Sequence, residues 1–153
     1  MMKTTEEIIK QQPVYLHDWD KSKKFGIIAD FSGVYMSPEE YAALAAPYEN
    51  KEYWVEKKEE MTKEIDRYKD VNILFASYSY ANYSGDAWVL FEQDGQLFEV
   101  NGSHCSCYGL EGQWNKEPVV LEELKNRLEK GNLGTEDYCG NEFAAELKVF
   151  LGL

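Results

Sequence analysis

The sequence lacks any apolar run of the length that a membrane span requires. A helix needs roughly 18 or more apolar residues to cross a bilayer, and no segment of the 153 residues provides them. The first residues, MMKTTEEIIKQQP, carry two glutamates and only a short apolar pair, whereas a secretory signal needs a continuous apolar core. We therefore expect a cytoplasmic protein without a membrane partner.

Basic residues are scarce. The chain has 16 lysines and arginines against 28 aspartates and glutamates, which gives a net charge of −12 at pH 7. Such a surface repels phosphate backbones, so we expect no direct nucleic-acid partner. A partner protein with a basic surface is compatible with this charge.

Cysteine is also rare. The three cysteines are an odd number, and two of them are separated by a single residue, so a disulfide framework is not indicated and a reducing compartment fits better. The sequence also contains no glycine-rich phosphate loop, no GxSxG elbow, no HExxH motif and no EF-hand loop. These absences remove the enzyme classes that short motifs most readily identify.

A β-hairpin is the clearest local signal. Asp94-Gly95 is typical of a two-residue turn with positive φ at both positions, and apolar segments flank it. Because such a loop fixes the register, the expected pairs are Gln93 with Gln96, Glu92 with Leu97, Phe91 with Phe98, Leu90 with Glu99 and Val89 with Val100. Phe91 and Phe98 then share one face of the sheet with Val89 and Val100.

The remaining patterns predict helices around this hairpin. Expected helices cover residues 4–11, 38–46, 51–68, about 120–130 and a last segment capped by Asn141; expected strands cover 25–29 (FGIIA) and 71–77. Trp54, Met61, Ile65 and Tyr68 are spaced along one side of the charged helix, which we expect to pack on the sheet.

Together these elements predict one α+β domain over residues 1–153. Its sheet is expected to be a three-stranded antiparallel meander, with a fourth strand as an alternative, covered by helices. Residues 1–70 form a variable-looking half with two helices, and residues 71–153 contain the hairpin, a cysteine loop and two helices.

The segment Asn101–Gly109 is the first candidate site, because it presents His104, Cys105 and Cys107 just after a strand. Three interpretations remain open. The two cysteines bind zinc, with His104, Cys139 or His17 completing the site. Alternatively, Cys105 is a nucleophile and His17 or Asp86 its base. In the third, both cysteines are small buried apolar residues and His104 is a surface residue.

Aromatic side chains crowd the same region. Such residues supply large contact area at protein interfaces, although they also fill cores. The candidates for a protein-binding surface are Tyr80, Tyr83, Tyr108 and Trp114.

The segment ILFASYSYANYSGDAWVLFEQDGQLFEVNGSHCSCYGLEGQW, with the following helix through Leu128, resembles a group of small uncharacterised bacteriophage and prophage proteins. These proteins carry the string EVNGSHCSCYGLEGQW nearly intact. The resemblance implies a cytoplasmic accessory protein of phage or mobile-element origin, and it implies no particular activity.

We therefore expect a protein that acts by binding another protein rather than as an enzyme, and that needs no cofactor. The alternative is a zinc-binding or cysteine-dependent enzyme centred on His104, Cys105, Ser106 and Cys107. The sequence leaves the partner and the oligomeric state open.

Overall fold

The computed structural model describes residues 1–47, 51–136 and 138–153. In these ranges the chain forms six helices and a five-stranded sheet with the strand order β1-β2-β3-β4-β5. The strands are β1 (Val14–His17), β2 (Asn72–Ala81), β3 (Ser84–Gln93), β4 (Gln96–His104) and β5 (Glu117–Pro118); the helices are α1 (Thr5–Ile9), α2 (Lys24–Ser32), α3 (Pro38–Ala45), α4 (Lys51–Asp66), α5 (Leu121–Glu129) and α6 (Ala144–Leu151). The predicted α+β class is confirmed, and a single domain fits this arrangement.

The predicted hairpin is confirmed in its register. All five expected pairs between β3 and β4 are present. Asp94 and Gly95 have φ values of 54° and 83°, and the Gly95 amide donates to the Glu92 carboxylate at 2.7 Å. The turn therefore has the left-handed backbone that its residues predict.

The predicted antiparallel meander is present, but the sheet is larger and its strands are of mixed direction. β2, β3 and β4 form an antiparallel meander, but β1 pairs with β2 in parallel and β5 adds a two-residue edge next to β4. The sequence did not predict β1, because its four residues are too few to display alternation. The N-terminal half thus contributes a strand to the same sheet.

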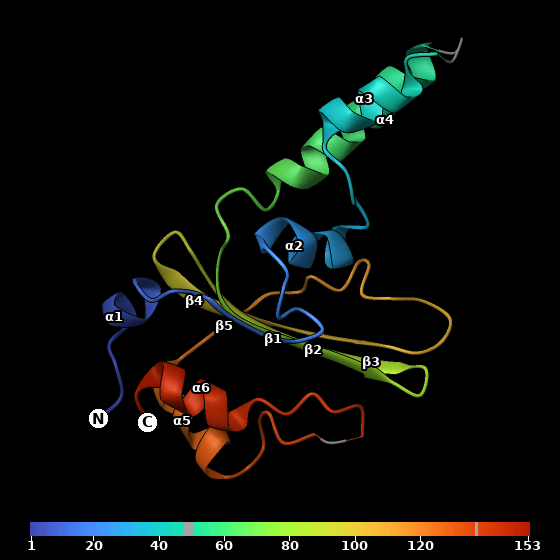
Figure 1. Ribbon diagram of the computed structural model, residues 1–153. Coiled ribbons are helices and arrows are strands. Elements are labelled where there is room, and N and C mark those ends of the chain that lie inside the picture. Colours follow the sequence, from blue (N-terminus) through green and yellow to red (C-terminus); the bar gives the residue numbers. More distant parts are fainter. Residues whose placement is uncertain (48–50, 137) are drawn as a thin grey trace.

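Helices cover both faces of the sheet. Figure 1 shows α2 over one face and α5 with α6 over the other. Phe31 of α2 lies in the core of the first face, while Leu147 of α6 lies in the core of the second. The expected strand over residues 25–29 is wrong, since these residues belong to α2. A short apolar run does not by itself distinguish a buried helix from a strand.

The hairpin of α3 and α4 projects away from the sheet beyond α2 (Figure 1). The predicted start of α3 is confirmed, because Ser37 accepts a hydrogen bond from the Glu40 amide. The expected packing on the sheet is confirmed for Tyr68, just beyond the end of α4, which is buried against Trp114, but it is wrong for α4 itself. The rings of Trp54 and Tyr41 of α3 pack together with their centroids 5.7 Å apart, and Ile65 lines a cavity beside α2. Amphipathic spacing predicts that one side is covered, but not by which element.

The C-terminal segment closes the second face. Leu124 and Leu128 of α5 are buried as predicted. The expected cap at Asn141 is wrong, because α6 begins after Phe143. Asn141 is instead buried and accepts a hydrogen bond from Ser77 of β2 at 2.6 Å.

The two ends of the chain lie side by side (Figure 1), and the Lys3 amide donates to the Leu151 carbonyl at 2.8 Å. Over the three described ranges, none of the helices combines the length and apolarity that crossing a bilayer would take.

The Gly95→Ala variant tests the turn. A Cβ atom at this position meets no atom within 4 Å, so the loss comes from the left-handed backbone alone. We expect the free energy of unfolding to fall by about 1–2 kcal/mol in urea denaturation. Gly95→Asn should lose clearly less, because asparagine tolerates this conformation. Equal losses in the two variants would contradict this explanation.

Candidate functional site

Two hairpin ends meet at one end of the sheet. The turn Asn82-Tyr83 joins β2 to β3, and β4 runs on into a second tight turn closed by a bridge between Cys105 and Tyr108. Tyr80 pairs with Gly85, which in turn pairs with His104. We call the three exposed tyrosines at this end, Tyr80, Tyr83 and Tyr108, the tyrosine tip.

The first turn holds Tyr83 in an unfavourable conformation. Asn82 and Tyr83 have φ values of 53° and 65°. Asparagine accepts the left-handed region readily, whereas a tyrosine there is uncommon. The Tyr83 side chain is 72% exposed, so burial in this chain does not offset the strain of its backbone.

A glycine allows two rings from different strands to meet. A Cβ atom on Gly85 would lie 2.2 Å from Nε2 of His104, so the imidazole lies directly over this glycine. It stacks on Tyr80 with the ring centroids 5.1 Å apart and the planes at 16°, and it meets Tyr78 edge-on at 5.7 Å. The rings of β2 and β4 thus contact each other across β3.

Hydrogen bonds define the tautomer of His104. Nδ1 lies 3.1 Å from the carbonyl oxygen of Cys105; because a carbonyl only accepts, Nδ1 carries the hydrogen and Nε2 accepts from the Tyr78 hydroxyl. Burial raises the pKa of Tyr78 to about 12, and the carboxylates of Asp30 and Asp18 add to the shift. Tyr78 therefore remains a donor at neutral pH.

The second turn carries two exposed thiols. Cys105 and Cys107 are both exposed. The backbone N–H of Cys107 lowers the pKa of the Cys105 thiol, and hydrogen bonds from the Cys107 side chain and the Tyr108 backbone lower it further. Partial desolvation raises this pKa but does not outweigh the hydrogen bonds. Gln113 fixes the turn, because its side chain accepts from the Ser103 amide at 2.8 Å and donates to the Gly109 carbonyl at 2.9 Å.

The expected zinc ligands are not brought together. Ser79 donates to the Cys139 carbonyl at 2.7 Å, whereas its strand neighbours Tyr78 and Tyr80 contact His104. Because neighbouring side chains of a strand point to opposite faces, Cys139 and His104 lie on opposite sides of the sheet. Within the three described ranges, no three His, Cys, Asp or Glu residues form a group that could hold a metal ion.

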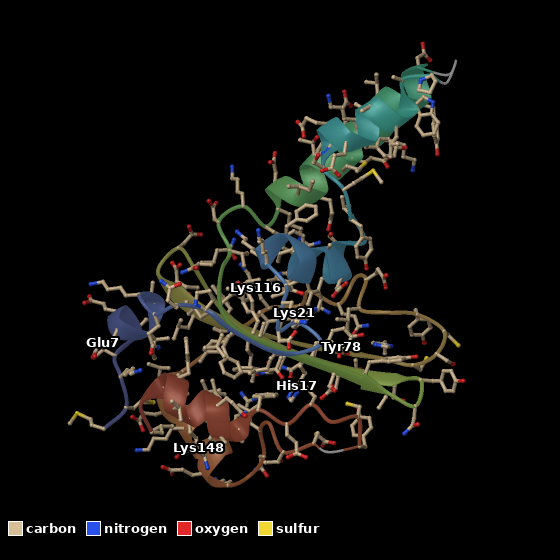
Figure 2. All side chains as sticks on the ribbon, in the orientation of Figure 1. Glu7, His17, Lys21, Tyr78, Lys116 and Lys148 are labelled. Atoms are coloured by element: carbon tan, nitrogen blue, oxygen red, sulfur yellow. The ribbon has the colours of Figure 1, made fainter. Side chains whose placement is uncertain are left out.

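The expected bases for Cys105 are engaged elsewhere. His17 ends β1 beside Tyr78 (Figure 2), and its Nε2 lies 2.7 Å from the Glu142 carbonyl. Burial raises the pKa of Asp86, as does the charge of Glu136, while a hydrogen bond from Asn141 opposes the shift. Asp86 therefore interacts with the segment that leads into α6, on the face opposite His104.

The four aromatic candidates differ in how far their side chains are exposed. Tyr80, Tyr83 and Tyr108 are 47%, 72% and 70% exposed, whereas Trp114 is 7% exposed. The Trp114 ring packs against the ring of Phe31 in the core under α2, with the two ring centroids 5.0 Å apart. Trp114 is thus a core residue, and its assignment to a binding surface is wrong.

Sequence reasoning missed the roles of Gly85, Tyr78 and Gln113. A usable signal existed for Gly85, because counting pairs outward from Asp94-Gly95 places it opposite His104. No comparable signal existed for Gln113, since its bridging depends on the three-dimensional path of the loop.

The chain matches no protein-family model, no curated protein and no solved structure, so similarity assigns it no function.

The Gly85→Ala variant tests the stacked rings. The new methyl group must displace the His104 ring, with loss of the Tyr78 hydrogen bond and the Tyr80 stack. We expect the free energy of unfolding to fall by about 1–3 kcal/mol, and NMR contacts between the His104 and Tyr80 rings to disappear. Tyr78→Phe removes only the hydrogen bond and should retain those contacts. Unchanged His104 resonances in Gly85→Ala would contradict this arrangement.

Proposed function

We propose that the chain is a small cytoplasmic accessory protein of phage or mobile-element type, which binds another protein through the tyrosine tip. The single observation that carries the proposal is Tyr83. It places a large, exposed aromatic ring on a left-handed turn residue, where glycine or asparagine would cost less. Because the Tyr83 ring is 72% exposed, packing within the described part of the chain offsets little of this strain, and a contact with a partner would account for it.

The chemistry of the tip favours a partner with basic side chains. Tyrosine rings bind guanidinium and ammonium groups through cation–π contacts, and the chain carries a net charge of −12 at pH 7. Asp18 and Asp30 lie near enough to Tyr78 to raise its pKa, so negative charge extends to this end of the sheet. An arginine-rich or lysine-rich protein surface complements both features.

The double variant Tyr83→Asn/Tyr108→Ser tests the proposal. Recovery of partner proteins from a bacterial lysate on the immobilised chain should fall at least tenfold, because central aromatic residues of interfaces typically contribute about 2 kcal/mol or more. The matched control, Tyr53→Ser/Val149→Ser, alters an exposed residue on each of α4 and α6 and should recover the same proteins as the wild type.

Measuring the free energy of unfolding distinguishes a loss of binding from a loss of folding in this test. Tyr83→Asn should raise the free energy of unfolding by about 1 kcal/mol, because asparagine relieves the left-handed strain. A variant that binds less while it unfolds at higher denaturant has lost a contact and not its fold. Equal recovery of the same proteins by the wild type and the tip variant would refute the proposal.

Thiol chemistry is a second candidate, favoured by the lowered pKa of Cys105. The thiolate is the reactive form of cysteine, so an exposed thiol with a lowered pKa has a larger reactive fraction at a given pH than a free cysteine. A closed zinc site does not fit these residues, since both ring nitrogens of His104 already have partners in Cys105 and Tyr78.

Alkylation by iodoacetamide tests this candidate. The pH at which Cys105 reacts at half its maximal rate should lie below that of a free cysteine peptide, since the pKa of its thiol is lowered. The buried Cys139 is the internal control and should react only when the chain unfolds. A Cys105 profile that coincides with the peptide would remove this candidate. One equivalent of zinc in the purified chain, lost in Cys105→Ser/Cys107→Ser, would instead favour metal binding.

A further inference from the structure

The turn that follows β4 holds two thiols next to each other. Cys105 and Tyr108 form the bridge that closes this turn, with Ser106 and Cys107 as the two residues between them. Both cysteines are exposed, and the Cys107 side chain hydrogen-bonds the Cys105 sulfur. The two sulfur atoms therefore contact each other on a surface that solutes can reach.

The backbone of the turn has the right dimensions for a disulfide between these residues. Consecutive Cα atoms are about 3.8 Å apart, so on a tight turn the Cα atoms of residues 105 and 107 are roughly 5–6 Å apart. Disulfides usually span about 4.4–6.8 Å between Cα atoms. The bonds of the Gln113 side chain to the Ser103 amide and the Gly109 carbonyl hold the loop in this shape.

Cys105 has the features of an attacking thiol. The backbone N–H groups of Cys107 and Tyr108 donate hydrogen bonds to its sulfur and lower its pKa, which enlarges the reactive thiolate fraction. Cysteines that respond to oxidants typically combine a low pKa and exposure with a second cysteine close enough to complete the reaction. Cys107 occupies that second position.

No other described cysteine or histidine is placed to take the role of Cys107. Cys139 is buried, on the opposite face of the sheet from His104. The two ring nitrogens of His104 are engaged by the Tyr78 hydroxyl and the Cys105 carbonyl. The chemistry of this turn therefore depends on its own two thiols.

We propose that Cys105 and Cys107 are a thiol–disulfide exchange pair whose substrate is the disulfide of a small thiol. The Cys105 thiolate attacks one substrate sulfur, which releases one thiol and leaves a mixed disulfide at residue 105. Cys107 then gives its proton to solvent and attacks the Cys105 sulfur, which releases the second thiol and joins residues 105 and 107. Two electrons pass to the substrate, so one disulfide becomes two thiols, each of which takes its proton from solvent.

This inference rests on the thiol reactivity proposed above as the second candidate, and adds to it a partner residue and a substrate class. Exposed disulfides are labile, and disulfides in a reducing cytosol are usually transient. The reduced pair is therefore the resting state, and a small thiol in excess restores it by the reverse exchange.

Incubation of the folded chain with two equivalents of glutathione disulfide at pH 7, followed by acid quenching and mass spectrometry, tests the proposal. The wild type should lose two hydrogens and retain no glutathione, and peptide mapping should locate the new bond between residues 105 and 107. Cys107→Ser should accumulate one glutathione at residue 105, because the second step is blocked. Cys105→Ser should take up glutathione at least fivefold more slowly, because the thiol with the lowered pKa is gone.

Controls separate reactivity from folding. Both substituted cysteines are exposed, so the two serine variants should unfold at the same urea concentration as the wild type. Cys139→Ala removes the buried thiol and should exchange like the wild type.

Two results would overturn the proposal. One is a wild-type chain that retains glutathione or forms a covalent dimer, which would mean that Cys107 does not complete the reaction. The other is equal uptake of glutathione by Cys105→Ser and Cys107→Ser, which would mean that Cys105 is not the attacking residue. If alkylation still shows a lowered pKa for Cys105 while the wild type retains glutathione, the thiol reactivity stands and only the pairing is wrong. Recovery of partner proteins by the tyrosine tip is measured separately and is not affected by either result.

Discussion

The register that Asp94-Gly95 imposes on β3 and β4 is the constraint on which the rest of the structure depends. A slip of one residue would exchange the two faces of a strand. The register runs from the turn through nine pairs to Gly85 and His104. It directs His104 toward the face covered by α2, and Asp86 and Glu99 toward the face covered by α5 and α6. Two regions of different chemistry therefore lie back to back across the sheet.

The tyrosine tip retains a feature that stability alone does not explain, because Tyr83 has a left-handed backbone and an exposed ring. On the opposite face of the sheet, the buried Glu99 accepts hydrogen bonds from Arg127, Trp88 and Asn101, so its charge is compensated within the chain. Local strain is expected at functional sites, and this contrast supports the proposal that the tip binds a partner.

The sequence predicted what depends on local chemistry. The turn residues defined the hairpin, Ser37 defined the start of α3, and the spacing of Leu124 and Leu128 defined the buried side of α5. It failed where tertiary contacts decide. Residues 25–29 form part of α2, whose apolar side chains are buried against one face of the sheet. Trp114 is a core residue because Phe31 packs against its ring. The His104 segment was located correctly, but its stack over Gly85 depends on three strands that meet only in the fold.

The most direct test of the central claim, that the tyrosine tip contacts a partner protein, is site-specific photo-crosslinking in bacterial cells. A benzoylphenylalanine residue is placed at position 83, at position 108, or at the control positions 53 and 149. The tip positions should both yield crosslinks to the same protein, and the control positions should not. If positions 83 and 108 yield no crosslink, or yield the same products as the controls, the tip is not a binding surface.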